Sequence, residues 1–156
     1  MTIIQDLYET HIPVADFERS RRFYEDLLGL EVGWIDEGQR RLLYWVGAPG
    51  KAMLGIREVP ADQISRQHFA FELSLADMKY AVPFLKEKGI KCHNRCDGSD
   101  HPQVFGWMPA VAIYFHDPDD HLLEFIAMLP DKPRPDIGLM RWDEWNRIGA
   151  PARGSS

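Results

Sequence analysis

Short segments rich in strand-forming residues recur along the first half of the chain. They lie at 6–14, 30–32, 41–47 and 51–58. Between the first two, residues 16–28 place apolar side chains at helical spacing, with Asp16 as a suitable N-cap and Gly29 placed to end the helix. The pattern therefore predicts the order β-α-β-β-β.

The second half repeats this order. A strand at 68–73 precedes a helical pattern at 76–88, which contains Pro83 and ends before Gly89. Further strands are predicted at 90–96, 110–116 and 121–128. The connection at 97–109 is longer than its counterpart in the first half. Such repetition indicates two copies of one structural unit.

The predicted boundaries are residues 1–60 for the first unit, 61–129 for the second and 130–156 for a tail. Closely spaced prolines favour an extended start to this tail. Residues 137–148 are expected to form one or two helical turns that pack on the body or on a partner subunit. The end, residues 152–156, is expected to be disordered.

Alternation along the strands puts several polar side chains on faces that need not contact the helices. One such set contains the metal-capable residues His11, His68 and Glu124, which follow one another at nearly equal intervals. Two imidazoles and a carboxylate form a ligand set for a divalent ion with open positions. A metal would also offset the cost of burying Glu124 within an apolar run. An arginine such as Arg57 or Arg95 is the alternative partner for this carboxylate.

Composition narrows the range of functions. The chain is 45% hydrophobic and 27% charged, which is ordinary for a soluble globular protein. A formal net charge of −6 argues against a nucleic-acid partner but leaves room for a small anion held by an arginine or a metal. The sequence shows no secretory signal and no apolar run near the roughly 20 residues that span a bilayer. A cytoplasmic protein without a membrane partner is expected.

Two cysteines are too few for a disulfide framework. If Cys92 and Cys96 share one strand, their side chains lie about 13 Å apart, at roughly 3.3 Å per residue. We therefore interpret them as structural residues.

Four features together resemble the vicinal oxygen chelate superfamily, which includes glyoxalase I, fosfomycin-resistance proteins, bleomycin-resistance proteins and extradiol dioxygenases. The apolar residue that follows the glycine after each helix is one. The other three are the stretches THIPVADFERSRRFYEDLLGLEV, HFAFEL and AVAIYFHDPDDHLLEFI. The resemblance covers about residues 6–128.

The resemblance implies an α+β fold of two βαβββ modules, whose sheets form a half-open cup with the helices outside. It assigns His11, His68 and Glu124 as ligands of one divalent ion per site, which would be Zn, Ni, Co, Mn or Fe. A homodimer and a small-molecule substrate are also implied. Asp120 replaces the glycine that is usual in the Asp-Pro-Asp turn, and an aspartate tolerates the left-handed conformation that such a turn requires.

Some members take a fourth ligand from the last strand of the first module. The aligned residue here is Leu54 or Gly55, neither of which can bind a metal. Glu58 lies close by, but it is too far along the strand in either alignment. This departure argues against ordinary glyoxalase I activity.

The function predicted on these grounds is that of a glyoxalase-like, metal-dependent lyase, isomerase or epimerase acting on a small bidentate substrate. Glu9 and Glu72 are the candidate general bases. Tyr44, Arg57 and Trp107 are the expected pocket residues.

Several alternatives remain open. One is a fosfomycin-resistance-type thiol transferase or hydrolase, and another is a small extradiol-like dioxygenase. The third is a non-catalytic protein that confers antibiotic resistance by binding a drug or metabolite.

Overall fold

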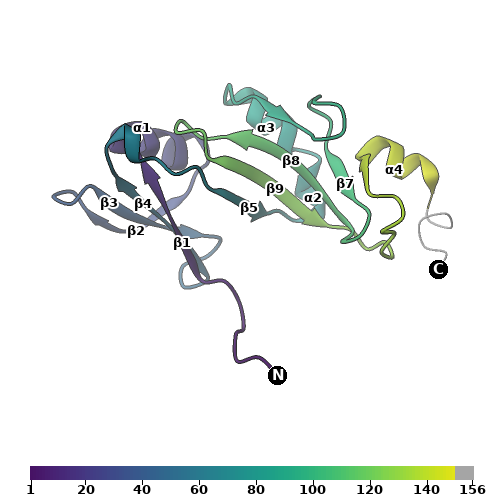
Figure 1. Ribbon diagram of the computed structural model, residues 1–156, viewed down its shortest axis with the longest axis horizontal. Coiled ribbons are helices and arrows are strands. Elements are labelled where there is room, and N and C mark those ends of the chain that lie inside the picture. Colours follow the sequence, from purple (N-terminus) through teal and green to yellow (C-terminus); the bar gives the residue numbers. More distant parts are fainter. Residues whose placement is uncertain (150–156) are drawn as a thin grey trace. The chain divides into compact units, whose positions relative to one another are not determined.

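Residues 1–149 are described by a computed structural model, shown in Figure 1. Contacts divide the chain into two compact units. The first comprises Met1–Gln67 together with Asp117–Asp120, and the second comprises His68–His116 and the residues from His121 onward. Each unit contains one sheet and its own helices, which confirms the predicted α+β class.

The first unit follows the predicted order. Its main elements are β1 (Glu9–Val14), α1 (Phe17–Arg21), η1 (Arg22–Leu27), β2 (Glu31–Asp36), β3 (Arg41–Val46) and β4 (Ala52–Glu58). The short 3₁₀ turn η2 (Ala61–Gln63) follows β4. The sheet has the order β1-β4-β3-β2, in which β1 runs parallel to β4 and the other pairs are antiparallel.

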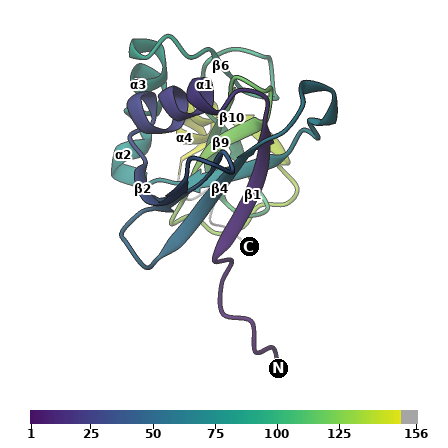
Figure 2. The same ribbon diagram turned by 90° about the vertical axis from the view of Figure 1, so that its left-hand side faces the viewer.

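The predicted first helix is an α-helical turn that continues as a π-helix. The Asp16 side chain accepts the backbone N–H of Arg19 at 2.9 Å, as expected for an N-cap. Gly29 follows the helix with φ of +79°, which is accessible to glycine without strain. The helical segment lies over one face of the sheet (Figure 2) and buries Phe17 and Tyr24 completely.

Tyr44 belongs to this helix-facing core. It is fully buried, and its hydroxyl donates a hydrogen bond to Oε1 of Glu25 at 3.1 Å. Burial raises the pKa of the phenol, and the neighbouring Glu25 carboxylate adds to the shift. The expectation that Tyr44 lines a substrate pocket is therefore wrong, because alternation along β3 turns it toward the helix.

The turn Asp117–Asp120 packs within the first unit. Asp120 adopts φ of +66°, and its N–H donates to the carbonyl of Asp117. The hydroxyl of Tyr24 donates to Asp117 at 2.6 Å, and Arg19 forms an ion pair with Asp119 at 2.6 Å. Aspartate at position 120 therefore preserves the turn, as the sequence predicted.

The second unit repeats the strand pairing of the first. Its strands are β5 (His68–Glu72), β6 (Cys92–His93), β7 (Gln103–Phe105), β8 (Ala110–His116), β9 (Leu122–Met128) and β10 (Leu139–Arg141). β5 runs parallel to β9, while β8 pairs antiparallel with β9, β7 and β6. β5 and β9 thus correspond to β1 and β4.

The helix predicted at 76–88 is divided into α2 (Leu75–Met78) and α3 (Ala81–Glu87). Pro83 lacks an N–H and would clash inside a continuous helix, so the chain restarts and places it in the first turn of α3. Phe84 of α3 packs near Phe125 of β9, with ring centroids 6.3 Å apart. None of the helices within residues 1–149 is long and apolar enough to cross a membrane.

The strand predicted at 90–96 ends at His93, because Asn94 organises the next residues as a loop. The Asn94 carboxamide is buried and donates to Asp97, Ser99 and the carbonyl of His101. Its oxygen accepts the backbone N–H groups of Cys96 and Asp97. Cys92 and Cys96 therefore do not share a strand, and both thiols are free.

Replacing Asn94 with alanine is expected to destabilise the protein by about 2–3 kcal/mol, because several loop groups lose their buried partner. Urea unfolding measures the change. The matched control is Asn146→Ala on the exposed side of the last helix, which should alter stability by less than about 0.5 kcal/mol. Equal effects of the two substitutions would contradict the organising role of Asn94.

The tail packs on the second unit through two elements. β10, a strand that the sequence did not predict, pairs antiparallel with β7. The helix α4 (Trp142–Ile148) follows β10. Trp145 of α4 is fully buried. The disorder predicted for 152–156 lies outside the described residues.

Candidate functional site

His68 and Glu124 form a close pair in the second unit. The parallel register places His68 opposite Leu122 and Ala70 opposite Glu124, so both side chains project from the same face. Nε2 of His68 lies 3.3 Å from Oε2 of Glu124. Nδ1 of His68 lies 3.0 Å from the carbonyl oxygen of Leu122. A carbonyl oxygen only accepts, so Nδ1 carries a proton and donates it.

This tautomer has a consequence for Nε2. A neutral His68 with its proton on Nδ1 presents a lone pair at Nε2, and that lone pair faces the Glu124 carboxylate. Two acceptors at this separation require a cation between or beside them, which can be a proton or a metal ion. A histidine ligand commonly donates its other N–H to a carbonyl in the same way. The pair therefore fits a divalent metal.

Glu124 is only 5% exposed. Burial raises the pKa of its carboxyl, while His68 and Arg95 act in the opposite direction. Arg95 stacks over the ring of Tyr114 at 4.7 Å rather than forming an ion pair with Glu124 within residues 1–149. Arg95, one of the two arginines that the sequence offered as an alternative partner, therefore does not neutralise this carboxylate at close range in the described part of the second unit.

Aromatic side chains extend the face around this pair. Tyr114 lies opposite Glu124 on β8, and its ring centroid is 6.0 Å from that of His68. His93 stacks between Tyr114 and His116 at 5.9 and 5.6 Å. Tyr114 was not among the predicted site residues, although alternation along 110–116 places it on the face opposite to Ile113 and Phe115.

His11 occupies the corresponding position in the first unit. Its Nε2 lies 2.6 Å from Oε2 of Glu9, and both side chains are about half exposed. His11 pairs in register with Gly55. A Cβ added at Gly55 would lie 2.3 Å from Nδ1 of His11, so the imidazole rests directly on the glycine. Nε2 is therefore the nitrogen that faces away from β4.

The register also identifies the first-unit counterpart of Glu124. Glu124 lies two residues beyond the partner of His68, and Arg57 lies two residues beyond the partner of His11. This register corrects the sequence alignment, which pointed to Leu54 or Gly55. Leu54 is buried on the helix-facing side. A cation, Arg57, thus occupies the position that holds a carboxylate in the second unit.

Glu58 stabilises the fold and does not project from the face of the sheet that carries His11 and Arg57. Its Oε2 accepts the backbone N–H of Phe17 at 2.8 Å, and its Oε1 lies 3.5 Å from Nε of Arg40. Alternation along β4 places it on the opposite side from Arg57.

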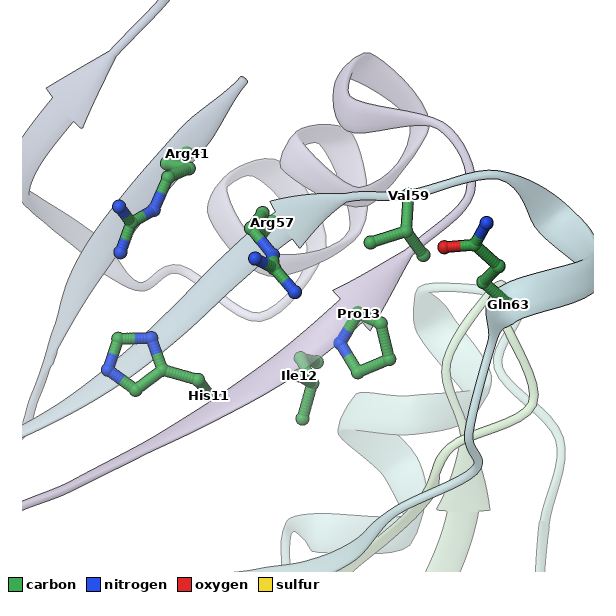
Figure 3. Close-up of a pocket in the computed structure, with 7 residues that line it drawn as sticks. All are labelled: His11, Ile12, Pro13, Arg41, Arg57, Val59 and Gln63. Atoms are coloured by element: carbon green, nitrogen blue, oxygen red, sulfur yellow. The ribbon is translucent and has the colours of Figure 1, made fainter. Parts of the chain in front are cut away.

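A pocket of about 500 Å³ opens beside His11 in the first unit. It is lined by His11, Ile12, Pro13, Arg41, Arg57, Val59 and Gln63. Figure 3 shows the side chains of Arg41, Arg57 and His11 rising from neighbouring strands, with Gln63 at the far end from Arg41. Of the predicted pocket residues Tyr44, Arg57 and Trp107, Arg57 lines this pocket.

The predicted ligands fall into both units. His68 and Glu124 are adjacent in the second, whereas His11 belongs to the first. Among residues 1–149, no three His, Cys, Asp or Glu side chains are gathered into a metal-binding cluster. Glu72 is exposed on β5, and Trp107 is 60% exposed in the turn between β7 and β8.

A protein-family model matches most of the chain. The family is described as the Glyoxalase/Bleomycin resistance protein/Dioxygenase superfamily, and the match covers residues 6–125. It therefore extends into both units and contains all three predicted metal ligands.

Individual relatives agree with this match. The uncharacterized protein YraH of Bacillus subtilis (strain 168) is 29% identical over 133 residues, which cover 79% of this chain and 98% of YraH. The integron cassette protein HFX_CASS4, from the mobile metagenome of the Halifax Harbour sewage outfall, is 31% identical with a TM-score of 0.68. That alignment covers 80% of this chain and all of the cassette protein. Oxidase ChaP-H2 is 25% identical with a TM-score of 0.62, covering 82% of this chain and 96% of the oxidase.

Proposed function

The chain belongs to the Glyoxalase/Bleomycin resistance protein/Dioxygenase superfamily, and we propose that it is a metal-dependent, glyoxalase-like enzyme. In this proposal, His11, His68 and Glu124 hold one divalent ion. The substrate is a small molecule with two adjacent oxygen atoms, and the reaction is of the lyase, isomerase or epimerase type.

The observation that carries the proposal is the arrangement of His68 and Glu124. A buried carboxylate faces Nε2 of an imidazole whose other nitrogen is hydrogen-bonded to a backbone carbonyl. Two nitrogen donors and one oxygen donor suit Zn, Ni, Co, Mn or Fe. When bound, such an ion supplies Lewis-acid stabilisation of the negative charge that develops on a substrate oxygen.

Glu9 is the better placed of the two proposed bases. Its carboxylate lies 2.6 Å from Nε2 of His11, the nitrogen available for a ligand role. If Nε2 of His11 serves as a metal ligand, it no longer pairs with Glu9. The Glu9 carboxylate on the same open face can then accept a proton from the substrate. Glu72 is four residues along β5 from His68, about 13 Å away at roughly 3.3 Å per residue. This separation makes it a poor partner for the same reacting atoms.

The first experiment is metal analysis of protein purified without chelator, followed by removal of the metal and reloading. We expect about one divalent ion per chain, bound reversibly with a Kd in the micromolar range or tighter. Turnover of a hemithioacetal, of fosfomycin with a thiol, and of a catechol then separates the possible reactions. A protein that is purified without metal and cannot be loaded would remove the proposal.

The similarity to an oxidase supports a second candidate. The alignment with oxidase ChaP-H2 covers most of both proteins at 25% identity. Two histidines with one carboxylate are also the ligand set of non-haem Fe(II) oxygenases. This candidate predicts oxygen uptake only after anaerobic loading with Fe(II). Turnover with Zn or Ni in the absence of oxygen would favour the Lewis-acid function instead.

A further inference from the structure

Arg41 and Arg57 lie directly opposite each other on β3 and β4. Both are exposed, and neither side chain makes an ion pair or hydrogen bond within residues 1–149. Like charges at opposed cross-strand positions destabilise a sheet. This face of the first unit therefore carries two cations that repel each other without local compensation, in a chain whose formal net charge is −6.

The acidic residues nearest in register have other partners. Asp36 lies opposite Arg41 on β2, but its Oδ1 accepts the backbone N–H of Gln39 at 3.0 Å. Glu9, on the same face of β1, is paired with His11. Neither carboxylate forms an ion pair with Arg41 or Arg57 in the described part of the chain.

We propose that Arg41 and Arg57 bind an oxyanionic group of the substrate, a carboxylate or a phosphate. Each guanidinium offers a planar set of donors that matches either group. The carboxamide of Gln63 adds hydrogen-bonding capacity to the same cavity, while Pro13 and Val59 provide apolar wall.

The position of His11 sets the size of the substrate, and this step rests on the proposed function. Arg57 lies two residues beyond Gly55, the register partner of His11, which corresponds to about 7 Å along the sheet. One end of the substrate would supply the two adjacent oxygens near His11, and the other end would supply the anion. The substrate class is therefore a 2-hydroxy or 2-oxo compound with a separate carboxylate or phosphate a few bonds away.

The anion site is tested on metal-free protein with two probes, inorganic phosphate and malonate, each compared with chloride at equal ionic strength. NMR signals of the Arg41 and Arg57 Nε–H groups should shift saturably, with a Kd on the order of 1 mM for the better probe. Arg41→Ala and Arg57→Ala should each weaken binding at least tenfold. Arg57→Lys keeps the charge but loses the planar fork, so intermediate binding is expected.

Arg22→Ala provides the matched control, because Arg22 is an exposed arginine of the same unit outside the pocket. It should bind both probes as the wild-type protein does. Preference for phosphate or for malonate identifies the anion. Shifts that do not saturate, or that are unchanged in the Arg41 and Arg57 variants, would overturn the anion site.

A second comparison separates this inference from the proposed function. His68→Ala protein should still bind phosphate or malonate, even when it no longer binds metal. In metal-loaded wild-type protein, malate should bind more tightly than lactate, which lacks the second carboxylate, and Arg57→Ala should remove that preference. If the wild-type protein binds the anion but no metal, the anion site stands and the proposed metal-dependent function is wrong. If it binds metal but no anion, the proposed function stands and the anion site is wrong.

Discussion

A His68→Ala variant is expected to bind divalent metal at least about 100-fold more weakly than the wild-type protein. Loss of a hydrogen-bonding partner behind a metal ligand already costs about 10–100-fold in affinity, so loss of the ligand itself should cost no less. Glu124→Gln should have a similar effect because it removes the negative charge and leaves a poor metal donor in its place. Isothermal titration with Mn, Co, Ni and Zn after chelator treatment measures both changes.

His101→Ala is the control for a general effect of removing a histidine. His101 is an exposed residue of the same unit, and its ring lies outside the His68–Glu124 pair. Its metal affinity should equal that of the wild-type protein. Wild-type affinity in His68→Ala would show that the ligand assignment is wrong.

Mixed dimers identify the chain that supplies His11. If the protein is a homodimer whose sites combine His11 of one chain with His68 and Glu124 of the other, a dimer of His11→Ala and His68→Ala chains regains one complete site. If each site is built within a single chain, the mixed dimer contains none. Metal content of dimers purified with two different tags distinguishes the two arrangements.

The pattern of strand-forming residues predicted most of the fold. Alternation and glycine positions predicted both β-α-β-β-β repeats, and β1 with β4 and β5 with β9, the first and last strands of each repeat, pair in parallel. The predicted elements are interrupted where a local interaction competes with the hydrophobic pattern. Pro83 interrupts one helix, and the buried Asn94 carboxamide ends the strand at His93.

The site was predictable only in part, because a strand pattern assigns faces but not register. Alternation placed His68 and Glu124 on one face, and the structure brings them within 3.3 Å. Register is needed to see that Arg57, rather than Leu54 or Gly55, corresponds to Glu124. Tyr44 was misassigned although the same alternation assigns it to the helix side with Leu42.

Gly55→Ala should lower metal affinity at least tenfold while changing stability little. The new Cβ would lie 2.3 Å from Nδ1 and 2.7 Å from Cε1 of His11, so the imidazole must leave its place. Because the His11 side chain is 49% exposed, it can rotate into solvent at small cost to the fold. We expect a stability change near or below the lower end of the roughly 1–3 kcal/mol that overpacking costs in a buried core.

Gly33→Ala is the matched control on β2, at the other edge of the same sheet from β1. Its Cβ would approach Cε of Met53 at 2.8 Å and Nε1 of the Trp45 indole at 2.9 Å. Met53 ends in a flexible thioether and Trp45 lies on β3, so an adjustment here does not displace His11 and metal affinity should remain at the wild-type value. Calorimetric unfolding and metal titration of both variants separate the two effects. Equal metal affinities in the two variants would show that the imidazole does not need Gly55 to reach its ligand position, and the glycine would then be a feature of sheet packing alone.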